Sequence, residues 1–302
     1  MIAEKDRKAF LESLVGRSNG RRTMAYAWRD VILYALGVGA HMEDLPYVYE
    51  KGGLKVLPAF AVLPYLNSIM VEPRVNNPIH PFTIVKEAMI EQEGRNIGGL
   101  HMAMNIELFG KIDPMQGTIL IDDHVAGVYD RGEDKGVGVR GVMDLWDIAG
   151  NKLARLTSDH VARAWGGFGG EKMPSEKIEI PDRDPDFTAE EQMAPTQALL
   201  YRLLGDVNDV HVDVNLAQSL GYEKPFMMGM CTYGYAARMA IQEVIPYEPE
   251  RVTRIYGQMR SLCFPGEKVR LAAWKMDEHR VHYRLLNDSG KAVIDKGILE
   301  FR

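Results

Sequence analysis

The feature of this sequence that most constrains its fold is an internal repeat, in which one order of segments occurs twice. In each half a short helical stretch is followed by a loop with a proline, an apolar helix and a series of alternating strands. Gly37 and Gly205 occupy matching positions, and Pro58 and Pro225 follow them at nearly the same distance. A repeat of this length indicates an old duplication of one folding unit.

Alternating apolar and polar residues predict three strands in each half. The predicted strands cover 118–128, 136–148 and 152–165 in the first half, and 267–277, 279–287 and 291–301 in the second. Residues 228–244 place apolar side chains on most faces of a helix, as expected for a helix wrapped by a sheet. Such a helix in a curled antiparallel sheet is an α+β unit, and two units can pair their sheets edge to edge.

A stretch rich in glycine, proline and charge separates the halves at about 167–187 and predicts an exposed linker. We therefore divide the chain into a first unit at 1–170, a linker at 171–187 and a second unit at 188–302.

Polar residues concentrate between two apolar stretches of the second unit, where Asp206, Asn208 and His211 are spaced by two and three positions. A buried carboxylate and imidazole can satisfy each other and orient a water molecule. The same residue types also cap helices, and this alternative stays open. The matching positions of the first unit hold Val38 and Glu43, so the repeat places any chemistry in the second unit only.

Gly229 stands at the start of the predicted apolar helix, a few residues after Pro225. The first N–H groups of a helix are unpaired and carry a partial positive charge, so they stabilise an anionic oxygen. A reaction that forms an enolate from a thioester needs such a donor. An ordinary connection between a loop and a helix would show the same sequence, so this alternative to an oxyanion site stays open.

The run YRLLGDVNDVHVDVNLAQSLGYEKPFMMGMCTYGYAAR, at 201–238, resembles the signature of the type-2, R-specific enoyl-CoA hydratases. That family includes the MaoC-like proteins and the hydratase part of the peroxisomal multifunctional enzyme. The first half resembles the non-catalytic half of two-domain members at 29–40, 57–58 and 166–170. The resemblance spans nearly the whole chain and implies a tandem (double) hot-dog fold, with antiparallel sheets each wrapped around a long central helix.

The resemblance also implies the roles of four residues. Asp206 and His211 would hold and activate the attacking water, Asn208 would support them, and the backbone N–H of Gly229 would form the oxyanion hole. The implied reaction is reversible hydration of a trans-2-enoyl-CoA to an (R)-3-hydroxyacyl-CoA by a hydro-lyase. It needs no metal and no cofactor, because coenzyme A is part of the substrate.

The sequence departs from the family pattern at two positions, where Asp209 replaces the usual proline and Met228 the usual histidine. These departures, and the missing acid and base of the first unit, favour a bulky or long acyl group, as in fatty acid or steroid side-chain metabolism. One alternative is a dehydratase of a branched dicarboxylic hydroxyacyl-CoA, which an arginine facing the pocket would favour. Another is a non-catalytic acyl-CoA-binding subunit.

Further residues are candidates for substrate binding. The candidates are Gly166, Gly167 and Gly169 for close approach to a CoA phosphate, Arg254 and Arg260 for its charge, and Met228 for the acyl pocket. The alternative for the glycines is a strand end, that for the arginines is a solvated strand face, and that for Met228 is core packing.

The overall charge and the cysteines limit the partners and the compartment. A formal charge of −6 argues against nucleic acid as a partner. The two cysteines have no paired spacing, the other histidines have no metal-ligand spacing, and no segment has the composition of a signal peptide or a membrane span. We therefore expect a cytoplasmic protein that does not bind a metal or a membrane, and the family resemblance implies a homodimer.

Overall fold

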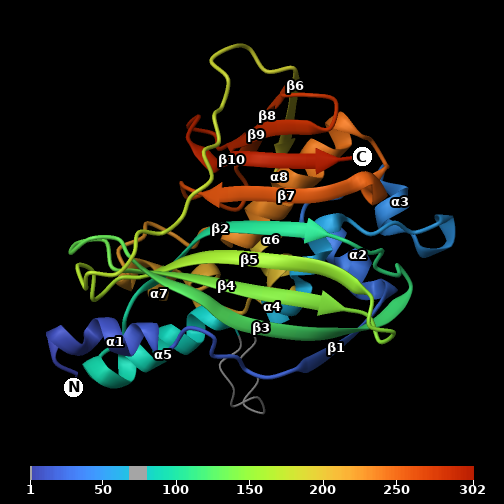
Figure 1. Cartoon of the computed structure of the whole chain (residues 1–302). Helices are drawn as coiled ribbons and strands as arrows, with labels where there is room; N and C mark the ends of the chain where they lie inside the picture. The colour runs from blue at the N-terminus through green and yellow to red at the C-terminus, as the bar shows by residue number, and fades with distance from the viewer. Residues whose placement is uncertain (1, 68–79) are drawn as a thin grey trace.

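The structure, a computed structural model, describes residues 2–67 and 80–302. Ten strands form one antiparallel sheet in the order β1-β3-β4-β5-β2-β7-β10-β9-β8-β6 (Figure 1). The strands are β1 (Arg22–Ala27), β2 (Gly99–Leu108), β3 (Gln116–Asp130), β4 (Val137–Trp146), β5 (Lys152–Ala162), β6 (Phe187–Gln192), β7 (Val252–Met259), β8 (Lys268–Lys275), β9 (Arg280–Leu286) and β10 (Ala292–Phe301). The six predicted strands are confirmed.

The strand order is the same in the two halves. From edge to centre it is β1-β3-β4-β5-β2 in the first half and β6-β8-β9-β10-β7 in the second. The halves meet where β2 pairs antiparallel with β7, from Ala103 opposite Gln258 to Glu107 opposite Arg254. The edge-to-edge pairing predicted from the repeat is confirmed, and it leaves no open strand edge between the halves.

The helices are short apart from α2, α5 and α8. They are α1 (Arg7–Glu12), α2 (Trp28–Gly37), α3 (Leu45–Val48), α4 (Leu63–Asn67), α5 (Pro81–Glu93), α6 (Gln197–Tyr201), α7 (Val214–Ser219) and α8 (Gly229–Val244). The 3-10 turns are η1 (Glu4–Asp6), η2 (Glu50–Gly52), η3 (Pro58–Val62), η4 (Arg202–Leu204), η5 (Asp209–His211) and η6 (Pro249–Arg251). None of the described helices is long and apolar enough to cross a bilayer.

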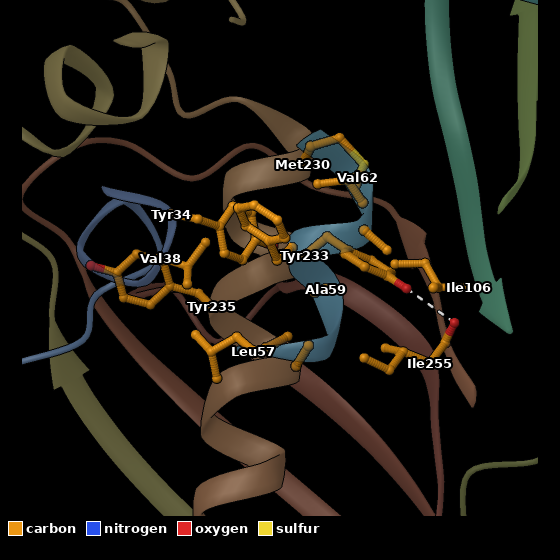
Figure 2. Packing of buried hydrophobic residues seen from close by; sticks show 14 of the residues in the cluster. Tyr34, Val38, Leu57, Ala59, Val62, Ile106, Met230, Tyr233, Tyr235 and Ile255 are labelled. Carbon is orange, nitrogen blue, oxygen red and sulfur yellow. Dashed lines mark hydrogen bonds between the residues drawn. The ribbon is translucent and has the colours of Figure 1, made fainter. Parts of the chain in front are cut away.

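Helix α8 is the centre of the core, and its residues from Met230 to Ile241 are all buried. Tyr233 donates its hydroxyl to the carbonyl oxygen of Ile255 in β7 at 3.0 Å, and η3 packs on the same helix (Figure 2). A Cβ added to Gly234 would lie 2.4 Å from Val38, so this glycine lets α8 approach the end of α2. The apolar helix predicted at 228–244 is confirmed to within one residue.

The long central helix expected in the first half is not found within the described residues. Its place after Pro58 holds η3 and α4, and residues 68–79, which follow, lie outside the described part of the chain. The next helix, α5, packs against β3 and β4.

The predicted linker contains no helix or strand up to residue 186, and its last residue, Phe187, begins β6. It is not fully exposed, however. Ile178 is buried, the carbonyl oxygen of Pro174 accepts a bond from Arg140, and that of Glu179 lies 2.8 Å from Nδ1 of His282. The linker therefore lies against strands of both halves of the sheet.

Candidate active site

Asp206 and His211 lie in the segment between η4 and α7. Gly205, with a φ of 127°, turns the chain directly after η4. The two side chains that follow this turn are each 8% exposed, in a region that otherwise buries apolar groups. Buried polar groups of this kind need partners.

His211 is fixed by the segment that leads into α8. Its Nδ1 lies 2.8 Å from the carbonyl oxygen of Phe226. A carbonyl only accepts, so Nδ1 carries the proton and Nε2 of the neutral ring remains an acceptor. The Phe226 ring also meets the imidazole edge-on, with centroids 5.0 Å apart. Because Phe226 precedes Gly229 by three positions, both contacts hold the imidazole beside the start of α8.

Asp206 interacts electrostatically with His211. Burial raises the pKa of Asp206, while the charge of His211, the backbone N–H of Asn208 and the charge of Arg202 act in the opposite direction. The structure therefore brings together a carboxyl group whose proton affinity is enhanced and an imidazole that can accept a proton.

Asn208 and Asp209 are both exposed, and each has a local partner. The side chain of Asn208 accepts from the N–H of Val210 at 3.4 Å and caps η5, so only its backbone acts on Asp206. The carboxylate of Asp209 is 68% exposed and lies 3.6 Å from Arg202. The added charge of Asp209 thus points to solvent.

Gly229 is the first residue of α8, and its backbone N–H has no acceptor within the helix. The residue is partly exposed, whereas Met228 before it is fully buried. The carbonyl of Met228 accepts from Cys231 and Thr232 and so starts the helix. This arrangement leaves the Gly229 amide free to bind an anionic oxygen.

The glycine run at 166–170 does not match its expected role. The N–H groups of Gly167 and Gly169 donate to the carboxylate of Asp130 at 2.8 and 2.7 Å. A Cβ at Gly166 would lie 2.0 Å from the carbonyl oxygen of Gly132. The run closes a tight turn around Asp130, so these two amides are not free for a CoA phosphate.

Of the two candidate arginines, Arg254 is already paired and Arg260 is exposed. Arg254 forms ion pairs with Glu176 at 2.5 Å and Glu300 at 3.5 Å, and its Nε donates to Asn105. The expectation that Arg254 meets the CoA phosphates is wrong in this structure, because its guanidinium is neutralised. Arg260 follows Met259, whose side chain lies beside Gly229, and therefore remains a candidate.

The sequence did not single out a cluster of aromatic rings in the first half. The hydroxyl of Tyr65 lies 2.9 Å from Nε2 of His160, whose ring stacks on His101 and Phe82. Burial, and secondly the charge of Asp206, raise the pKa of Tyr65, so this end of the cluster lies near the candidate site. Burial, reinforced by neighbouring charges, lowers the pKa of His80 in the same cluster to about 3. These rings come from separate elements and share no sequence motif. The one feature that links two of them is the pairing of β2 with β5, which sets His101 opposite His160.

The arrangement suits acid–base chemistry on a substrate that develops an oxyanion. The acceptor nitrogen of His211 and the carboxyl group of Asp206 can exchange protons, and the Gly229 amide can stabilise negative charge. Among the described residues, no three histidine, cysteine, aspartate or glutamate side chains are grouped so as to hold a metal ion.

Comparisons with known proteins agree with this geometry. Residues 176–295 match the family model "MaoC like domain", and residues 24–155 match "MFE-2 hydratase 2 N-terminal domain". The chain is 32% identical to 3-hydroxyacyl-thioester dehydratase Y of Mycobacterium tuberculosis, over 92% of this chain and 94% of that protein. It is 30% identical to the mouse peroxisomal multifunctional enzyme type 2 over 95% of this chain, and spans 38% of that enzyme.

A solved structure gives the same result. The MaoC-like dehydratase from Phytophthora capsici superposes with a TM-score of 0.81 at 27% identity, covering 97% of each chain. The chain thus belongs to the MaoC-like, type-2 enoyl-CoA hydratase family, has the hot-dog fold of that family, and is a hydro-lyase that acts in enoyl-CoA hydration.

Proposed function

We propose that this enzyme catalyses the reversible hydration of a trans-2-enoyl-CoA to an (R)-3-hydroxyacyl-CoA, with a bulky or long acyl group. The second unit, 188–302, is the catalytic one; the first unit, 1–170, is non-catalytic and is joined to it by 171–187. The observation that carries the proposal is the bond between His211 and the carbonyl of Phe226, which ties the imidazole to the segment that leads into Gly229.

In the proposed mechanism the thioester oxygen accepts a hydrogen bond from the N–H of Gly229. The water oxygen bonds to C3 while one of its protons passes to the Asp206–His211 pair, and the electrons of the double bond move onto the thioester oxygen as an enolate. The pair then returns a proton to C2, so water is added with no net change in the enzyme. No metal or cofactor takes part, and Asn208 supports Asp206 through its backbone N–H.

The acyl preference is supported by the first unit. Val38, at the position that matches Asp206, is buried in the core against α8, and Glu43 is exposed. The second unit has the 16-residue α8. At the equivalent position of the first unit, after Leu57, the described residues form only η3 and α4, which are short. We expect this reduced unit to accommodate the acyl chain. Met228 is fully buried in the apolar core, which favours core packing over its expected place in the acyl pocket.

The alternative with a dicarboxylic substrate needs an unpaired arginine in the pocket. Arg238, which lies in α8, is instead paired with Glu191 and bonded to the carbonyl of Val38. Arg238 therefore does not supply this group, and the exposed Arg260, next to Met259, is the arginine that would have to do so.

The test is an absorbance assay at the enoyl-thioester band over enoyl-CoAs of increasing size, with chiral analysis of the product. We expect the (R)-product and a higher kcat/KM for long or branched chains than for crotonyl-CoA. Equal turnover of crotonyl-CoA and all bulkier thioesters would contradict the acyl preference. Asp206→Ala should lose nearly all of the rate and still bind CoA; a wild-type protein that binds acyl-CoA without any hydration would instead be a binding subunit.

We further propose that the protein is a homodimer located in the cytoplasm. Both cysteines, Cys231 and Cys263, are free and buried, which suits a reducing compartment. Several relatives are named as peroxisomal, so fractionation of the cells that make this protein is the direct test.

A further inference from the structure

A cavity of about 450 Å³ lies between the two halves, away from the candidate active site. Val252, at the start of β7, lines it, whereas Met259, at the end of the same strand, lies beside Gly229. At a rise of about 3.4 Å per residue, the two ends of β7 are roughly 24 Å apart. In Figure 1 the start of β7 lies near α3, and its arrow points to the opposite end of the sheet, on the side of α7.

The cavity occupies the position in the first half that the active site occupies in the second. In the strand order, β2 matches β7, so Leu108 at the end of β2 matches Met259. Leu108 lines the cavity together with Pro58, the first residue of η3, which is the counterpart of α8. The cavity and the candidate active site are therefore at equivalent positions of the repeat, at opposite ends of the central strand pair.

The first-half pocket has lost the groups that would perform the chemistry. Val38 replaces the aspartate and packs against Gly234 of α8, and Glu43 replaces the histidine and is exposed. Nevertheless the space has been kept, with a volume that lies in the usual range for small-molecule sites.

The lining of this cavity combines apolar walls with positive charge. Leu54, Val56 and Ile112 are among the apolar lining residues. The charged lining residues are Lys55, Lys111, Arg302 and Glu250, so basic residues outnumber acidic ones there in a chain whose formal charge is −6.

Only one of the two lysines at the cavity is already paired. Lys55 donates to the carbonyl of Tyr247 and lies 3.4 Å from Glu250. Lys111 is exposed and, within the described part of the chain, has no ion-pair partner. Basic residues such as Lys111 at the rim of an apolar pocket suit a ligand with an anionic head and an apolar chain.

We propose that this cavity is a second, non-catalytic binding site for an acyl chain with an anionic head group, either a free fatty carboxylate or an acyl-CoA. The apolar chain lies against Val56 and Ile112, and the head group is held by Lys111. The site is independent of the hydration chemistry, because none of its residues belongs to the Asp206–His211 pair.

The test is calorimetric titration of the whole protein with dodecanoyl-CoA, which is saturated and cannot be hydrated, and separately with dodecanoate. We expect two dodecanoyl-CoA sites per chain, of which Val56→Trp removes one, while Val56→Leu keeps both. Neither variant changes kcat or KM for an enoyl-CoA. Lys111→Glu, at an exposed position that the fold does not need, weakens the second site at least about threefold, and the effect disappears at high salt.

The two ligands identify the head group, since binding of dodecanoate shows that a carboxylate suffices and binding of the thioester alone requires the CoA phosphates. The proposal is overturned if the protein has a single site that neither Val56→Trp nor Lys111→Glu affects. It is also overturned if Val56→Trp raises KM for long but not short enoyl-CoAs, because the cavity would then be the far end of the active-site acyl path. Loss of hydration in the Asp206 variant tests the proposed function separately.

Discussion

Arg238 in the middle of α8 forms a buried ion pair with Glu191 at the end of β6, with side chains only 4% and 18% exposed. The same guanidinium donates from Nε to the carbonyl oxygen of Val38 at 2.8 Å. One side chain therefore ties the central helix of the second half to its edge strand and to the first half.

We expect Arg238→Met to destabilise the fold by about 3 kcal/mol, the lower end for breaking a buried ion pair, because it leaves the partly buried Glu191 carboxylate without its guanidinium partner. Arg238→Met combined with Glu191→Gln should recover part of that loss, since no charge is then stranded. Lys268→Met is the matched control: Lys268 pairs with Glu190 on the surface, where both side chains are more than half exposed, and should cost at most about 1 kcal/mol. Urea unfolding measures all three; equal losses for Arg238→Met and Lys268→Met would refute the argument.

The role of the Gly229 amide can be tested by removing only its proton. Proline is tolerated at the first position of a helix, and Met228 before it has a ψ of 134°, which suits the residue before a proline. Gly229→Pro should lower kcat by about 10²–10³-fold with the fold intact, the usual effect of losing one oxyanion donor. Gly229→Ala keeps the N–H and adds a Cβ 3.3 Å from the flexible Met259, so it controls for size. If both variants lose activity equally, the amide is not the donor.

His211→Ala should lower kcat by at least about 10²-fold, because the acceptor nitrogen beside the start of α8 is lost. His279→Ala, at an exposed position, is the control and should leave kcat unchanged. Steady-state kinetics with one enoyl-CoA suffices. A loss below threefold for His211→Ala would show that another group transfers the proton.

Local sequence patterns were sufficient to predict α8 and six of the ten strands; β1, β2, β6 and β7 were not predicted. Apolar residues on most faces between 228 and 244 indicated a buried helix, and that helix begins one residue later. Asp206 and His211 could be singled out together because both lie in one short segment, so chain connectivity alone brings them close; their catalytic role stays a prediction.

Contacts between distant segments could not be predicted in this way. The sequence around Arg254 is compatible with a solvated strand face. It does not reveal that Glu176 of the linker forms an ion pair with Arg254. The glycines at 167 and 169 looked free because Asp130, their acceptor, lies far back along the chain at the end of β3. The bond between Tyr65 and His160 likewise depends on how the first half folds onto the sheet.

Asp206→Asn should make the protein inactive and more stable at neutral pH. Burial raises the pKa of Asp206, so the folded state holds its proton more tightly than the unfolded state, whose value is about 3.8. Stability therefore falls as pH rises from about 3.8 through the folded-state pKa, and the neutral asparagine avoids this loss. Thermal unfolding between pH 3.5 and 8 should show a Tm advantage for the variant that vanishes at the acid end. A variant less stable than wild type at pH 7 would contradict the assignment.

The ring cluster of the first half should make stability sensitive to mild acid. Burial lowers the pKa of His80 to about 3 from the ordinary 6.5, so on acidification the unfolded chain gains a proton that the folded state refuses. The stabilisation is complete above pH 6.5 and decreases as pH falls towards 3, by about 2 kcal/mol between pH 7 and pH 5 for this one group.

His80→Phe keeps a ring to stack on Phe82 and His160 but cannot take a proton, so its stability should depend less on pH by that amount. His124→Phe changes an exposed histidine and should leave the wild-type dependence intact. Parallel urea unfolding curves at pH 7 and pH 5 measure the difference, and an unchanged dependence in His80→Phe would show that His80 is not held neutral by burial.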